Sequence, residues 1–171
     1  MYCEFNMFTL NLYEIILKMN HTFDITLKNR DLFLHFLETI PLDLLNKVPN
    51  GFNNNIFWNI RHTVVTQQAL VYGLSGLPLH VSAEDVQDYK KGTKPEKNVT
   101  KDEVDLCKNQ LHALVKKTEE DWNEGLFKNY KEYTVTTKTT LTSAKDAIEF
   151  NNFHEGIHLG YVLAMKRALR I

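Results

Sequence analysis

The chain has 171 residues, of which 43% are hydrophobic and 24% charged, a composition typical of one globular domain rather than of a disordered or fibrous protein. Twenty Lys and Arg residues against twenty-one Asp and Glu residues give a formal net charge of -1. Such a balance provides no general attraction to phosphate backbones or anionic lipids, so we expect neither nucleic acid nor a membrane as a partner.

The spacing of apolar residues predicts four helices, of which the first two lie in the N-terminal half. The first runs from about Thr22 to Ile40 and stops at Pro41, which cannot continue a helix. The second follows Asn53 and Asn54, both good N-cap residues, and ends near residues 73–76. A loop of about twenty-five residues follows, long enough to be functional, with one short helical turn begun by Ser82.

The C-terminal half carries the other two predicted helices. The third opens at Thr100 with Glu103 three residues later, the pattern of a capping box. The fourth opens at Ser143 and continues almost to the C-terminus, with a core face of Ala147, Phe150, Tyr161, Met165 and Leu169. Between them, the β-branched run 133–141 predicts a short extended segment. The expected fold is therefore an all-α, antiparallel four-helix bundle with long loops and one short extended segment before the last helix.

Residues 1–18 are apolar and precede the predicted bundle, so we treat them as an N-terminal extension to a domain of residues 19–171. Two interpretations stand side by side: a genuine helical extension, or a start codon misassigned upstream of Met19. They lack the basic leading region and the cleavage site of a signal peptide. Cys3 and Cys107 form no disulfide framework or thiolate metal motif, which fits a reducing cytoplasm. The apolar surface of residues 1–18 also offers a face for a homodimer.

Three of the seven histidines lie on inward-facing helical stripes. His154 and His158 are one turn apart on the fourth helix, so their side chains project from one face. His62 lies one turn after Trp58 on the second helix. Three histidines from two helices are typical of catalytic metal sites that keep a position open for water or substrate. From the residues alone, core histidines held by hydrogen bonds are an equal alternative.

The same segment, His154-Glu155-Gly156-Ile157-His158, matches the metalloprotease motif in which the glutamate is the general base. The longer metzincin form requires further glycine and histidine residues that the chain lacks, since Tyr161 and Ala164 stand there. We therefore reject a protease and interpret Glu155 as a solvated residue or one that supports a ligand.

Two segments give the chain a resemblance to a known family, the DinB-like metal-binding bundle proteins. One runs from Asn55 through Trp58 and His62 to Leu74-Ser75-Gly76, and the other contains His154 and His158 with Lys166-Arg167 beyond. The resemblance covers about residues 20–171. It implies that His62, His154 and His158 hold one divalent transition metal ion, zinc or nickel. The spacing of Trp58 to His62 indicates that Trp58 is a wall of this pocket, and Tyr161 is the second expected wall residue.

The resemblance also suggests an activity, because characterised relatives include S-transferases that use thiols such as bacillithiol or mycothiol. We expect a metal-dependent thiol S-transferase with a small-molecule substrate and a thiol cosubstrate, while a metal-dependent hydrolase and a non-enzymatic stress-response or binding protein remain alternatives. The sequence identifies no catalytic residue: Gln67, Gln68, Asp121 and Tyr161 are polar groups near the interior without an assigned role. Arg61 is interpreted as a surface group and Cys107 as a core residue.

Overall fold

The structure is a computed structural model that describes the backbone of residues 5–171 and the side chains of residues 19–171. It is mainly helical, which confirms the all-α prediction. Its elements in chain order are α1 (Phe5–Thr39), α2 (Leu42–Asn46), α3 (Ile56–Gln68), a π-helix (Ala69–Gly73), α4 (Ala83–Tyr89), α5 (Lys101–Asn123), β1 (Tyr133–Thr134), β2 (Thr140–Leu141) and α6 (Ala144–Leu169).

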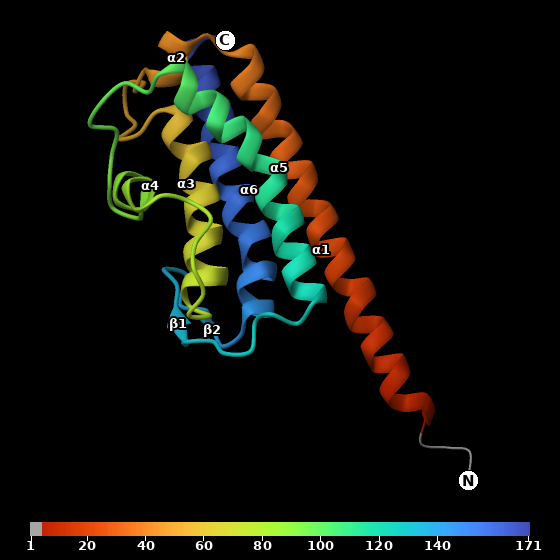
Figure 1. Ribbon diagram of the computed structural model, residues 1–171. Helices are drawn as coiled ribbons and strands as arrows, with labels where there is room; N and C mark the ends of the chain where they lie inside the picture. The colour runs from red at the N-terminus through yellow and green to blue at the C-terminus, as the bar shows by residue number, and fades with distance from the viewer. Residues whose placement is uncertain (1–4) are drawn as a thin grey trace.

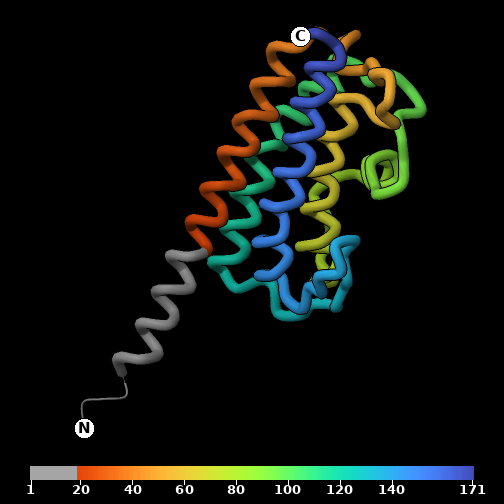
Figure 2. Tube along the Cα trace, turned by 180° about the vertical axis from the view of Figure 1, so that it is seen from behind, coloured from red at the N-terminus to blue at the C-terminus, as the bar shows by residue number. Residues whose placement is uncertain are grey.

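The long helices α1, α3, α5 and α6 pack side by side (Figures 1 and 2). Helix α6 contacts α1 on one side and α3 on the other, and α1 also contacts α5. Helices α1 and α6 run in one direction and α3 and α5 in the other, so α3 and α6 form an antiparallel pair whereas α1 and α6 are parallel (Figure 1). Within the described chain, no helix combines the length and apolar character needed to cross a membrane.

The predicted helix starts agree closely with the caps that form. The Thr100 side chain accepts from the Glu103 backbone and the Glu103 carboxylate accepts from the Thr100 backbone, which completes the predicted capping box of α5. Ser143 caps α6 with its hydroxyl oxygen, which accepts from the Asp146 backbone N–H. Helix α3 begins one residue later than predicted, because the Asn55 side chain, rather than that of Asn54, accepts from Trp58 N at 2.7 Å.

The first predicted helix is correct at its end but not at its start. Helix α1 ends at Thr39, just before Pro41, but it begins at Phe5 and not near Thr22. The proposed extension of residues 1–18 lies outside the side chains that the structure describes. The assignment of residues 1–18 as an extension therefore stays a prediction, and so does the homodimer that their apolar surface suggested.

Both predicted features of the connections are present. Ser82 caps the seven-residue helix α4 in the long loop between the π-helix and α5. The β-branched run forms a two-stranded antiparallel hairpin in which Tyr133 pairs with Leu141 and Thr134 pairs with Thr140. These two connections lie on the α3 side of the long helices (Figure 1).

The core consists of two apolar clusters along the helices. The larger one joins the C-terminal half of α1 to α3, α5 and the end of α6, and it includes Phe33, Ile60 and Leu111. The smaller one joins the start of the described part of α1 to the π-helix and the start of α6, and it includes Phe23 and Val71. Burial of large side chains in the larger cluster holds α3 against α6, at about 1.5–3 kcal/mol for each fully buried side chain.

Candidate metal centre

Three histidine rings meet where α3 packs against α6. The ring centroids are 5.1 Å apart for His62 and His154, 4.7 Å for His62 and His158, and 4.6 Å for His154 and His158. One nitrogen from each ring lies within 4.8 Å of the other two, so this cluster could hold a metal ion. The one-turn spacing on α6 presents two of the rings together, and the antiparallel neighbour α3 brings the third.

Hydrogen bonds at Nδ1 fix two of the rings. His62 Nδ1 lies 2.5 Å from the Tyr89 carbonyl oxygen, and His158 Nδ1 lies 2.9 Å from Asn59 Oδ1. The Asn59 amide orientation is set because its Nδ2 donates to the Asn55 carbonyl oxygen at 2.8 Å. Both partners only accept, so Nδ1 of each ring must carry the proton. Nε2 of His62 and of His158 is therefore the unprotonated nitrogen that can bind a ligand, and at His62 this nitrogen also lies 3.3 Å from Thr66 Oγ1.

The third ring offers a different observation. His154 Nδ1 is buried and has no hydrogen-bond partner within the described part of the chain. An unpaired buried polar atom costs about 1–3 kcal/mol. A metal ion shared by the three rings and bound by His154 through Nδ1 would relieve this cost, so the residues present fit such an ion.

The electrostatics of the cluster favour neutral rings. Burial is the main cause that lowers the pKa of His154 to about 3, and the neighbouring His158 and His62 rings add to the effect. Burial followed by the His62 ring lowers the pKa of His158 to about 3. Burial also lowers the pKa of His62, although the hydrogen bond to Tyr89 opposes the shift. Neutral imidazole is the form that binds metals, so all three rings are ready to do so near neutral pH.

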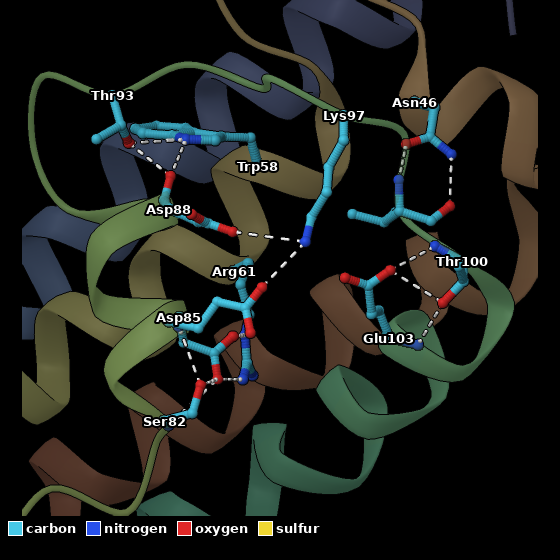
Figure 3. Close-up of polar contacts among 12 residues, drawn as sticks. Asn46, Trp58, Arg61, Ser82, Asp85, Asp88, Thr93, Lys97, Thr100 and Glu103 are labelled. Atoms are coloured by element: carbon cyan, nitrogen blue, oxygen red, sulfur yellow. Dashed lines mark hydrogen bonds and ion pairs between the residues drawn. The ribbon is translucent and has the colours of Figure 1, made fainter.

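Both predicted pocket-wall residues line a cavity of about 550 Å³ beside the histidines. The Trp58 ring stacks on His62 with centroids 4.6 Å apart and planes 10° apart, and its Nε1 donates to Thr93 Oγ1 at 3.2 Å (Figure 3). Tyr161 is 53% exposed at the cavity, with its ring 6.4 Å from that of His158. The placement of Tyr161 on the core face of the last helix is therefore wrong.

The cavity wall is mainly apolar and contains little charge. Among its described lining residues there is no Asp, Glu or Cys, and the one charged side chain is Lys91. Besides Trp58 of α3 and Tyr161 of α6, the aromatic and other apolar side chains of the wall come from the loop before α3, the π-helix, the hairpin and α6, and they are Phe52, Leu70, Tyr133, Val135, Phe150, Phe153, Ile157 and Met165. A site of this kind suits an apolar small molecule beside a metal ion.

A comparison with protein-family models matches residues 26–162 to the DinB superfamily. The chain belongs to the DinB superfamily. The match contains both α3 with His62 and the segment of α6 with His154 and His158, which confirms the family that the sequence motifs indicated. No curated protein matches the chain.

The glutamate of the His-Glu-x-x-His segment of this DinB protein points away from the cavity. Glu155 is completely buried, and its Oε1 accepts from Arg30 Nε at 2.9 Å, Arg30 Nη2 at 2.6 Å and Asn151 Nδ2 at 2.8 Å. The interpretation of Glu155 as solvated is thus wrong. Since the carboxylate is committed to an ion pair between α1 and α6, it does not act as a general base at the histidines.

Arg61 is a second buried charge that sequence reasoning misplaced. Its side chain is 3% exposed and pairs with Asp85 on α4, with Arg61 Nη2 2.8 Å from Asp85 Oδ2. The surface position expected for Arg61 is therefore incorrect. The expectation arose because Arg61 neighbours His62 and so faces away from the cavity, but that direction meets α4 instead of solvent.

The other polar candidates lie outside the described cavity lining. Gln67 Nε2 donates to Thr118 Oγ1 at 3.1 Å, and Asp121 accepts from Tyr72 Oη at 2.7 Å. Gln68 accepts from the His80 backbone at 2.9 Å. Cys107 is fully buried in the larger core cluster, as expected. Sequence reasoning missed Asn59, which was detectable as a polar residue three positions before His62 and so on the same helix face.

Proposed function

We propose that this DinB-superfamily protein is a metal-dependent thiol S-transferase acting on an electrophilic small molecule. His62, His154 and His158 would hold one divalent transition metal ion, zinc or nickel. The observation that carries the proposal is the composition of the cavity wall, which has an apolar surface beside the histidines and no carboxylate or cysteine among its described residues. A bound ion would supply Lewis acidity that lowers the pKa of a coordinated thiol or water.

This wall composition favours a thiol over water as the nucleophile. A free thiol has a pKa of about 8.5, against 15.7 for water, so its deprotonation needs less assistance from neighbouring side chains. No side chain in the described wall offers a carboxylate base. Because no cysteine lines the described wall either, the thiol must come from a cosubstrate.

The reaction balances as a substitution. The thiol loses its proton to solvent, its sulfur forms a bond to an electrophilic carbon, and that carbon releases its leaving group with the bonding electron pair. The protein would contribute binding and orientation: the stacked Trp58 ring and Phe150 exclude water, and Lys91 at the rim offers a positive charge to an anionic group of either substrate.

The first experiment is elemental analysis of protein purified without a histidine tag. We expect about one transition metal ion per chain in the wild type and a loss of that metal in His158→Ala. His35→Ala is the matched control, because His35 is an exposed histidine on α1 and should leave the metal content unchanged. A wild type that contains no metal and takes up neither zinc nor nickel would refute the site.

The second experiment tests the reaction. The metal-loaded protein is incubated with an aromatic chloride electrophile, with and without a low-molecular-weight thiol, and product is followed against the uncatalysed rate. Thiol-dependent turnover that disappears in His158→Ala supports the transferase. Turnover by water alone would identify a hydrolase, and a bound metal that neither turns over nor exchanges a ligand with azide or thiol would identify a binding protein.

A further inference from the structure

Helix α4 is attached to α3 through two neighbouring residues of the chain. Arg61 reaches Asp85 near the start of α4, with Nε donating to Oδ1 at 3.0 Å and Nη2 lying 2.8 Å from Oδ2. His62 reaches the carbonyl oxygen of Tyr89, the last residue of α4. Asp85 and Tyr89 are one helical turn apart, so the two contacts hold the same face of α4 against α3.

The contact at Arg61 is a strong anchor. Both side chains are largely removed from solvent, with 3% exposure for Arg61 and 18% for Asp85, and a two-point contact between guanidinium and carboxylate fixes orientation as well as distance. Arg61 Nη1 also donates to Gln110 on α5 at 2.5 Å. Asp85 Oδ2 accepts from the Ser82 hydroxyl at 2.8 Å within the capping box of α4 (Figure 3). The start of α4 is thereby held to both α3 and α5.

The contact with the Tyr89 carbonyl determines which ring nitrogen of His62 carries the proton. The last four carbonyl groups of a helix lack partners within that helix, so the Tyr89 carbonyl is available to a neighbouring donor. It can only accept, and it therefore places the imidazole proton on Nδ1 of His62. Nε2 is then the nitrogen that remains for an ion shared with His154 and His158.

We propose that Arg61 and Asp85 are positioning residues for His62. Their ion pair fixes the position of α4 along α3 so that the Tyr89 carbonyl oxygen accepts from His62 Nδ1. This contact keeps Nε2 of His62 directed at His154 and His158. The inference rests on the metal site of the proposed function and goes beyond it. It gives α4, a helix that contributes no metal ligand, the role of orienting His62. Neither Arg61 nor Asp85 lines the cavity in the described structure.

The test uses Asp85→Asn, which removes the charge but keeps the shape, and Arg61→Lys, which keeps the charge but loses the two-point geometry. Zinc affinity of the full chain is measured by competition with a chromophoric chelator. We expect zinc affinity about 10–100-fold weaker in both variants, the loss typical when a partner that orients a metal ligand is changed. In the metal-free protein, nitrogen-15 NMR should show less of the Nδ1-protonated form of His62 than in the wild type.

Asp121→Asn is the matched control. Asp121 is another buried carboxylate paired with a cation, Lys117, but it contacts Tyr72 and lies away from α4. This variant should lower the melting temperature while leaving zinc affinity and the His62 proton position unchanged. A loss of zinc affinity in Asp121→Asn as large as in Asp85→Asn would show general loosening and overturn the inference.

The inference is also overturned if Asp85→Asn and Arg61→Lys bind zinc as tightly as the wild type with the same His62 proton position. If Asp85→Asn does not fold, Arg61→Lys decides the outcome by the same two measurements. A wild type that binds neither zinc nor nickel would refute the proposed function instead, and the NMR measurement on the metal-free protein would still decide whether the ion pair positions His62.

Discussion

The variant Glu155→Gln tests whether the Glu155 carboxylate has a structural or a catalytic role. Glu155 occupies the position of the general base in a His-Glu-x-x-His motif, yet its side chain is fully buried and Oε1 accepts from Arg30 Nε, Arg30 Nη2 and Asn151 Nδ2. The variant keeps an acceptor oxygen but leaves the Arg30 charge buried without compensation. Removal of one partner of a buried ion pair costs about 3–5 kcal/mol. For a domain of this size the melting temperature should fall by about 6–20 °C, at about 2–4 °C per kcal/mol.

The assay is a double-mutant cycle by urea denaturation. Arg30→Met and Glu155→Met should each destabilise the protein strongly, whereas the double variant should recover most of the loss, because two apolar side chains of similar volume replace the charged pair. Folded Glu155→Gln should also retain wild-type metal content, since Glu155 lies outside the histidine cluster. Wild-type stability of Glu155→Gln, or single losses that simply add in the double variant, would refute the reasoning.

Three further outcomes are expected. Asn59→Leu removes the acceptor of His158 Nδ1, so zinc affinity should weaken about tenfold in the competition assay, and an unchanged affinity would contradict this role. In the metal-free protein, the pKa of His154 and of His158 is about 3 against 6.5 in the unfolded chain, so the unfolded state binds more protons between these values. The free energy of unfolding should therefore fall as pH decreases from 6.5 towards 3, and a flat profile in urea would argue against it. Thr100→Ala removes the cap of α5 and should cost about 1 kcal/mol by the same method.

The histidine cluster could be predicted from the sequence because its members follow simple spacing. His154 and His158 are one turn apart, and His62 continues the stripe of Trp58, so helix geometry alone places all three on inward faces. The caps at Thr100 and Ser143 were equally readable, because a cap depends on residues only three positions apart.

The buried charges could not be predicted in the same way. Arg30 and Glu155 are 125 residues apart, and only the packing of α1 on α6 brings them together. Arg61 was assigned to solvent because nothing in the sequence indicates that α4 covers that side of α3.

Tyr161 was misplaced for a related reason. Helix α6 has two faces turned away from bulk solvent, one toward the core with Asn151 and Val162 and one toward the cavity with Phe150 and His154, whereas a single stripe was expected. A residue on the cavity face, such as Tyr161, is partly open to solvent, whereas a residue on the core face is buried.

The π-helix at Ala69–Gly73 forms a section of the cavity wall that a one-residue deletion could reshape. Leu70 lines the cavity, and its carbonyl oxygen accepts from Tyr130 Oη at 3.0 Å, which ties the segment before the hairpin to this turn. A π-turn bonds residue i to i+5, so it contains one residue more than the equivalent α-turn. Loss of a single codon here would restore a regular helix and rotate the short helical segment between this turn and the following loop by about 100°. His62 lies upstream of the turn, and His154 and His158 lie on α6 beyond the long loop and α5. A deletion at the π-turn would therefore change the cavity wall at Leu70 while the histidine cluster stays in place.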